Sequence, residues 1–264
     1  MRRPPHLPFL AGPPEFTVGL RPIAPEAWLQ PDTEAAHIPD KRRQIAAMGA
    51  LVHRELPEAA PILSAVADRI APRAADFRAA AETVSDDVCV MLRREEGWIL
   101  GGAVLCAPSQ WSLTEHFGKP LPHIHGGVPD KLGPGGTQAL AARITRVFDG
   151  LQPGQVLERF NWTVQFGPDR YLPNASLMRT RSTEWSAAEQ REGLWLRVER
   201  QTISKTEGAV VFTIRICLDP LAAVFAVEDA KLAFARAWRG APEHVRTYKR
   251  WSFFARAVDD VLSS

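Results

Sequence analysis

The stretch Arg159-Phe-Asn-Trp-Thr-Val-Gln-Phe166 alternates strictly between polar and apolar residues. Phe160, Trp162, Val164 and Phe166 are apolar, and the residues between them are polar. Successive side chains of a strand point to opposite faces, so this pattern places all the apolar side chains on one face. The stretch therefore predicts a half-buried strand of an antiparallel sheet.

Four further segments extend this sheet. Residues 194–201 and 210–218 show the same alternation, and the short link Lys205-Thr-Glu-Gly208 between them predicts a hairpin. Two apolar runs upstream, 87–93 and 98–106, are separated by Glu95-Glu96-Gly97 and predict a second hairpin. The sequence thus predicts about five antiparallel strands.

Helical periodicity fills the rest of the chain. Apolar residues recur at helical spacing from about Asp40 to Ile70, which predicts one or two amphipathic helices there. Pro57 and Pro61 divide this region, and each suits the first turn of a helix. Further helices are expected over the following ranges: 111–117, 137–148, 228–238 and 243–262. Helices before, between and after the strands define the α+β class.

Composition limits the class of protein. The chain has 264 residues, of which 45% are hydrophobic, and it carries 32 Lys and Arg against 30 Asp and Glu. We expect an N-terminal arm over residues 1–15, lying over the surface, and a single domain with helical extensions over 16–264. No long basic tract indicates nucleic acid, and no run is long enough to span a membrane. Three widely spaced cysteines favour free thiols and a cytoplasmic protein.

A segment after the second apolar run concentrates imidazoles, with His116, His123 and His125 inside ten residues. Imidazole is the commonest metal ligand in proteins. His116 is expected to be a surface or packing residue. His123 and His125 form a His-x-His pair that can share a metal, but no third ligand stands at a telling spacing. A single axial haem ligand needs only one imidazole, and the pair Gly126-Gly127 would let a flat macrocycle approach the backbone.

The polar residues of the predicted strands share one face and allow two interpretations. They are Asn161, Thr163, Arg197, Glu199, Gln201, Thr213 and Arg215. One interpretation is a solvated face with ion pairs across the strands. The other is the floor of a cavity, which the presence of arginine and the absence of lysine favour, because guanidinium groups recognise carboxylates with two donors. Both interpretations stay open at this point.

Several motifs occur together in one order along the chain. They are Cys-Ala-Pro-Ser-Gln-Trp-Ser-Leu (106–113), Gly-Lys-Pro-Leu (118–121), Ile-His-Gly-Gly-Val-Pro (124–129), Asn-Trp (161–162), Leu-Arg-Val-Glu-Arg-Gln-Thr (196–202) and Val-Val-Phe-Thr-Ile-Arg (210–215). Together with Gly19-Leu-Arg-Pro22 and Trp28-Leu29, this series resembles the haem-dependent oxidative N-demethylase alpha-subunit family over nearly the whole chain. Region 167–192 matches no motif and is expected to influence substrate choice.

The resemblance implies a fold and an activity. The fold would be a PAS-like domain, in which a curved five-stranded antiparallel sheet with flanking helices holds haem b. The activity would be a monooxygenase reaction that demethylates a small secondary amine such as dimethylamine with O2 and releases formaldehyde. Electrons would come from NADPH through FMN and an iron–sulfur cluster on partner subunits, since this chain has no dinucleotide fingerprint and no cluster-type cysteine spacing.

The resemblance also implies site residues. His125 stands at the histidine of the family's Ile-His-x-x-Val-Pro motif and is the expected axial ligand, with His123 as the fallback. Gly127 departs from the proline that the family more often has there. The remaining expectations assign Arg197 and Arg215 to the haem propionates, Trp111 to cofactor contact, Glu199 to orienting the arginines or binding a cationic amine, and Asn161 to hydrogen bonding with oxygen or substrate.

Two other functions compete with this one. A non-catalytic haem or small-ligand sensor of PAS type would use the same fold, since fold alone does not fix function. A metal-dependent hydrolase would instead use His123 and His125 together.

Overall fold

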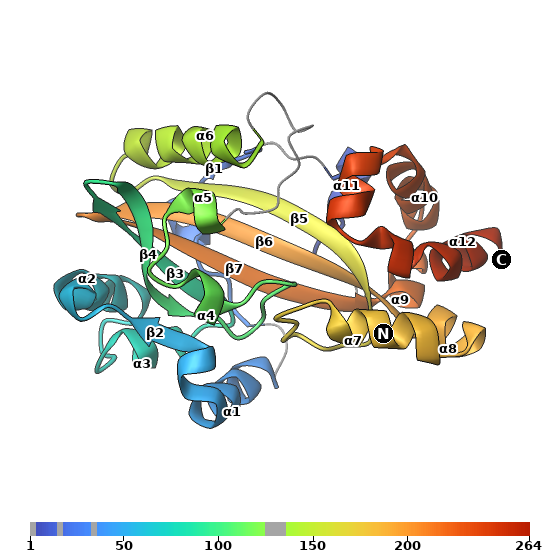
Figure 1. The fold of residues 1–264 in the computed structure, drawn as a ribbon, viewed down its shortest axis with the longest axis horizontal. Coiled ribbons are helices and arrows are strands. Elements are labelled where there is room, and N and C mark those ends of the chain that lie inside the picture. Colours follow the sequence, from blue (N-terminus) through green and yellow to red (C-terminus); the bar gives the residue numbers. More distant parts are fainter. Residues whose placement is uncertain (1–3, 15–17, 33–35, 125–135) are drawn as a thin grey trace. The chain divides into compact units, whose positions relative to one another are not determined.

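The structure of the protein, a computed structural model, describes residues 4–14, 18–32, 36–124 and 136–264. It is an α+β fold with a seven-stranded sheet in the order β1-β5-β6-β7-β3-β4-β2 (Figure 1). The strands are β1 (Arg21–Ile23), β2 (His53–Glu55), β3 (Asp87–Arg94), β4 (Gly97–Val104), β5 (Val156–Phe166), β6 (Leu194–Thr206) and β7 (Ala209–Pro220). The helices are α1 (His37–Met48), α2 (Ala60–Ile70), α3 (Phe77–Ala81), α4 (Leu113–His116), α5 (Leu121–Ile124), α6 (Gly136–Gly150), α7 (Ser176–Glu184), α8 (Ala187–Glu192), α9 (Leu221–Phe225), α10 (Ala230–Gly240), α11 (Glu243–Tyr248) and α12 (Ala255–Ser263).

All five predicted strands are present, but the predicted number of five is too small. The two additional strands, β1 and β2, have three residues each and occupy the two edges of the sheet. β1 pairs antiparallel with β5, and β2 pairs antiparallel with β4. Three residues are too few to show an alternating pattern, which is why the sequence did not reveal these strands.

The chain divides into two compact units. The first unit contains residues 1–17, 160–200 and 216–264, and the second contains 18–159 and 201–215. Strands β5, β6 and β7 each contribute residues to both units.

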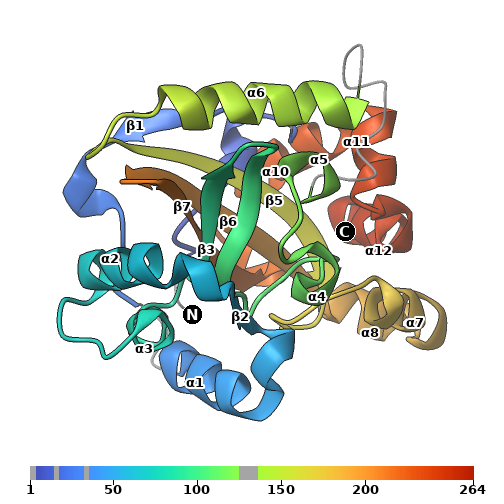
Figure 2. The same ribbon diagram turned by 60° about the vertical axis from the view of Figure 1, so that its left-hand side comes forward.

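The second unit is built on the hairpin of β3 and β4, with β2 beside β4 and with α1, α2 and α3 nearby (Figure 2). Gly102 on β4 allows α2 to approach closely: a Cβ atom there would lie 2.5 Å from Leu63 Cδ2. Pro57 and Pro61 stand in the first turns of a 3-10 helix (Pro57–Ala59) and of α2, as predicted. The predicted helical region 40–70 is therefore two helices, with the short strand β2 between them.

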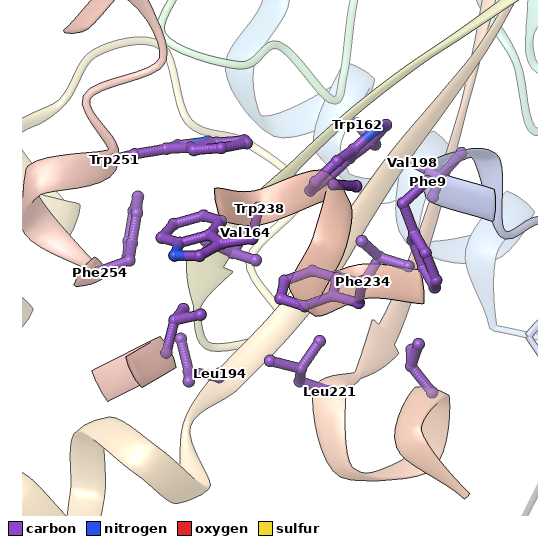
Figure 3. Close-up of a cluster of buried hydrophobic side chains, with 14 of the residues drawn as sticks. Phe9, Trp162, Val164, Leu194, Val198, Leu221, Phe234, Trp238, Trp251 and Phe254 are labelled. Atoms are coloured by element: carbon purple, nitrogen blue, oxygen red, sulfur yellow. The ribbon is translucent and has the colours of Figure 1, made fainter. Parts of the chain in front are cut away.

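The first unit has an aromatic core, shown in Figure 3. The ring of Trp251 stacks on that of Trp238 at 4.1 Å between centroids, and Phe9 meets Phe234 edge to face at 5.5 Å. Phe9 belongs to a 3-10 helix, Pro8–Ala11, and is 1% exposed. The expectation that residues 1–15 lie over the surface is therefore wrong for Phe9, whose side chain is part of this core.

The three cysteines are free, as their spacing predicted, and all three are buried. Burial raises the pKa of both the Cys89 and the Cys106 thiols, so neither is activated as a thiolate. Among the described residues, no helix is both long enough and apolar enough to cross a membrane.

Candidate functional site

The histidine-bearing segment of the second unit is fixed to strand β4. The backbone N–H of Gly118 donates to the Leu100 carbonyl at 2.9 Å, and the N–H of Leu100 donates to the Lys119 carbonyl at 3.1 Å. Pro120 forms an isolated bridge with Ile99. We call residues 113–124, which contain α4 and α5, the α4–α5 segment. Its attachment to a central hairpin gives it a defined position within the second unit.

Trp111 contacts both short helices of the α4–α5 segment. Its indole stacks on the His116 imidazole, with 4.5 Å between centroids and 15° between the planes. Its Nε1 donates a hydrogen bond to the Ile124 carbonyl at 3.2 Å. Burial lowers the pKa of His116, which Glu115 and a hydrogen bond with the His123 backbone partly offset. His116 is thus a packing residue, as predicted, and Trp111 fixes the last turn of α5.

One of the two candidate ligands, His123, lies near the end of this segment. His123 is in α5 and its side chain is exposed. His125, with Gly126 and Gly127, lies outside the described residues. Across the described part of the chain, no group of three or more His, Cys, Asp and Glu side chains is arranged to hold a metal ion.

The α4–α5 segment belongs to an apolar cluster of the second unit, to which it contributes Leu113 and Leu121. A buried cluster that includes Leu121, Met91 and Val210 forms the base. Partly exposed apolar residues pack against this cluster from β5, β7, α5 and α6: Leu157, Phe212, Ile214, Ile124 and Ile144. Helix α6 contacts α5, and α5 contacts β4. Ligand sites in proteins are lined mainly by apolar side chains with a few polar groups, and this partly exposed apolar surface has such a composition.

Asp87, at the start of β3, holds the chain where it leaves β4. Its two carboxylate oxygens accept hydrogen bonds from the backbone N–H groups of Cys106 and Ala107, both at 2.8 Å. Gln44 of α1 donates to the Cys106 carbonyl at 2.9 Å. These bonds fix the first residues of the 106–113 motif, so Asp87 supports the position of Trp111. The sequence marked Asp87 only as the end of an apolar run.

Lys41 of α1 is buried beside the residues that lead into β3, and it was not predicted as a site residue. Its Nζ donates to the carbonyls of Ala81, Val84 and Asp86 at 2.7, 3.0 and 2.5 Å. Burial lowers the pKa of Lys41, while Asp87 and other nearby acidic groups oppose that shift. Three carbonyl acceptors match the three N–H donors of an ammonium group. Lys41 therefore joins α1 to the chain that enters β3.

Arg215 is also engaged by protein groups. Its guanidinium donates twice to the Asp86 carboxylate, at 3.0 Å from Nε and 2.6 Å from Nη2. It also donates to the carbonyls of Pro31, at 2.8 Å, and of Gln30. Four of the five N–H donors of a guanidinium are thereby used.

In the first unit, the polar strand residues form a connected chain. Arg197 is 0% exposed, and its Nη1 donates to Gln165 Oε1 and to the Arg170 carbonyl, both at 3.2 Å. Glu199 Oε1 lies 3.6 Å from Arg197 Nε, and its Oε2 accepts from Asn161 Nδ2 at 3.1 Å. Lys249 Nζ donates to Asn161 Oδ1 at 2.7 Å. Asn161 and Glu199 are therefore brought together, beside two cations.

The interpretation of these strand residues as a solvated face is wrong for several of them. Arg197, Thr213 and Arg215 are all buried. Thr213 shares a hydrogen bond of 2.5 Å with Thr202 inside the second unit. Burial of polar groups is favourable only when they are hydrogen-bonded, and the structure supplies those bonds from within the protein.

Comparison with known proteins identifies the family. Residues 67–259 match the family model of the haem-dependent oxidative N-demethylase, alpha subunit-like proteins. The match covers most of the chain, and the protein therefore belongs to this family. No curated protein matches the chain.

Proposed function

We propose that this protein binds haem b and catalyses the oxidative demethylation of a small secondary amine such as dimethylamine. The observation that supports the proposal is the fixed α4–α5 segment, whose last helix carries His123 and packs Leu121 and Ile124 with apolar side chains of the second unit. This segment lies inside the region that matches the haem-dependent family.

The residues of the second unit fit a haem. A flat, largely apolar macrocycle requires apolar surroundings and one imidazole, and both are present around α5. We propose His125 as the axial ligand, with His123 as the fallback, and the central strands β5-β6-β7-β3-β4 as a PAS-like sheet. We further propose that residues 16–264 act as one haem-binding domain. When bound, haem supplies the chemistry that activates O2 and oxidises the methyl group. Trp111 would hold the ligand segment in place through its bond to Ile124.

Arg197 and Arg215 give weaker support for haem binding than the α4–α5 segment does. We keep Arg197 and Arg215 as candidates for the propionates, but each already donates to several protein acceptors. A propionate would have to use a remaining donor or replace one of these acceptors. Because Glu199 stands between Arg197 and the Asn161–Lys249 pair, we propose that it orients Arg197 rather than captures a cationic amine. Asn161 is the proposed hydrogen-bond donor to oxygen or substrate.

Catalysis would require an external electron donor. We propose partner subunits that carry FMN and an iron–sulfur cluster and draw electrons from NADPH, in the cytoplasm. The description of the family as alpha subunit-like supports the existence of other subunits.

Haem binding is tested by titrating the purified protein with haemin and recording the Soret band. We expect one haem per chain, and a changed or lost band in His125→Ala. His123→Ala is the parallel variant, and His244→Ala, on α11 of the first unit, is the matched control. A protein that leaves haemin unbound, or a spectrum that neither His125→Ala nor His123→Ala alters, would contradict the assignment.

Activity is tested separately on the haem-loaded protein. Dimethylamine-dependent consumption of NADPH with release of formaldehyde, in the presence of a flavin and iron–sulfur reductase, is expected of the enzyme. Stable haem binding without formaldehyde under these conditions would instead indicate a sensor.

A further inference from the structure

Residues 230–256 of the first unit, which include α10 and α11, are rich in positive charge, and the acidic pairs Glu228-Asp229 and Asp259-Asp260 flank them. Between Ala230 and Arg256 there are seven Lys and Arg but one Glu, whereas the whole chain has a net charge of +2. Two of the seven are engaged internally: Arg246 donates to the Trp238 carbonyl, and Lys249 donates to Asn161. The other five have no hydrogen bond or ion pair from their side chains to any residue in the described ranges; they are Lys231, Arg236, Arg239, Arg250 and Arg256.

Helix α10 presents part of this charge along one face. Leu232, Arg236 and Arg239 follow one another at i, i+4 and i+7, which places them on the same side of the helix, and all three are exposed. We call these three residues the α10 face. The opposite side contains Phe234 and Trp238, which are 0% and 1% exposed and belong to the aromatic core.

Leu232 makes the α10 face more than a solvated basic surface. Its side chain is 65% exposed, the largest value among the exposed large apolar residues that the structure describes. An exposed leucine on the same helix face as two arginines is typical of a protein interface, where arginine is enriched and lysine is depleted. Unpaired arginines at such a surface favour a partner with negative charge, because complementary charge speeds the encounter and fixes the orientation.

Two other anionic partners fit less well. A membrane-bound amphipathic helix inserts its apolar side into the lipid, but the apolar side of α10 is already buried in the core of the first unit. A nucleic-acid site neutralises several phosphates at once, commonly six to ten, and the α10 face offers two arginines.

We infer that the α10 face is the docking surface for the acidic surface of an electron-donor subunit. This inference rests on the proposed function, which requires such a donor. It deepens that proposal by assigning the donor's contact to Leu232, Arg236 and Arg239.

The test uses the full chain and an acidic plant-type [2Fe–2S] ferredoxin as the probe. Binding is measured by surface plasmon resonance at about 50 mM and about 200 mM salt, and it is expected to weaken with salt. The double variant Arg236→Glu with Arg239→Glu should weaken binding by roughly tenfold or more. Leu232→Ala should also weaken binding, and the size of its effect should change less with salt than the effect of the arginine double variant. The matched control is Arg73→Glu with Arg143→Glu, two exposed arginines of the second unit, and it should bind like the wild type.

Three results would overturn the inference. The first is a wild-type chain that does not bind ferredoxin at low salt, and the second is an equal loss of binding in the control double variant. The third is tighter binding to phosphatidylserine vesicles or to a duplex DNA than to ferredoxin at the higher salt concentration. All binding is measured on both haem-loaded and haem-free chains, so a failure of haem binding is seen in the Soret band and is distinguished from a failure of docking.

Discussion

Lys41→Met tests whether the buried ammonium of Lys41 holds the second unit together. The substitution keeps the length of the side chain and removes the donor from three carbonyls, those of Ala81, Val84 and Asp86. Each hydrogen bond to a charged group contributes roughly 1.5–3 kcal/mol net. Removal of the charge also relieves several kcal/mol of desolvation, so the three bonds do not add in full. We expect the free energy of unfolding to fall by about 3–5 kcal/mol, the range for loss of one partner from a buried charged cluster.

The measurement is urea unfolding followed by tryptophan fluorescence, with Lys231→Met, a substitution of a partly exposed lysine with no described partner, as the control. The control should change the free energy of unfolding by less than about 0.5 kcal/mol. A loss of less than about 1 kcal/mol in Lys41→Met would refute the reasoning, since that is less than one buried charged hydrogen bond contributes.

The difference in the free energy of unfolding between the wild type and Lys41→Met is expected to depend on pH. Burial lowers the pKa of Lys41 in the folded protein below 10.5. Between the folded pKa and 10.5, the unfolded chain binds more protons than the folded chain, so the free energy of unfolding rises with pH. Lys41→Met lacks this contribution. The stability difference between wild type and variant should therefore widen as the pH rises toward 10.5, and a difference that narrows would contradict the direction of the shift.

Three further substitutions test other parts of the structure. Asp87→Asn should lower the free energy of unfolding by about 2–4 kcal/mol, because an amide has one acceptor oxygen for two backbone N–H groups. Urea unfolding measures this loss, and an unchanged unfolding midpoint would contradict the prediction. Phe9→Ala should cost about 3–5 kcal/mol by the same method, since Phe9 is 1% exposed, and a near-neutral result would mean that the N-terminal segment is not part of the core. Gly102→Ala should lower Tm and cost about 1–3 kcal/mol, because its Cβ would lie 2.5 Å from Leu63 Cδ2. Gly150→Ala, whose Cβ would meet no atom within 4 Å, is its control and should leave Tm unchanged.

Much of the fold could be predicted from the sequence because long strands carry a pattern. The alternation in 159–166 and 210–218 lies within β5 and β7, and the two short links are the turns of the predicted hairpins. Strands β1 and β2 could not be predicted, because three residues carry no period and their pairing depends on distant partners. Phe9 was missed for a similar reason: it lies in a proline-rich segment, and its core partners Trp162 and Phe234 are more than 150 residues away.

Some residues of the candidate site could likewise be predicted from the sequence, and others could not. Trp111 and the α4–α5 segment could be found because motif residues and histidines lie close together in the sequence. The groups that support them could not. Lys41 is separated by 40 residues or more from the carbonyls to which it donates. Asp87 is separated by about 20 residues from the N–H groups whose hydrogen bonds it accepts. No local pattern distinguishes such a lysine or aspartate from one on the surface.

The arginines of the strands show why residue type alone does not identify a ligand site. Their number, without lysine, favoured a cavity floor that binds carboxylates. In the structure the same property serves the protein itself, because a planar guanidinium reaches several acceptors at once: Arg215 joins Asp86 to the carbonyls of residues 30 and 31. An ammonium does the same at Lys41 with three carbonyls. The buried cations of the second unit are thus satisfied without a ligand, and this shifts the weight of the haem hypothesis from the arginines to the imidazoles and to the apolar side chains beside α5.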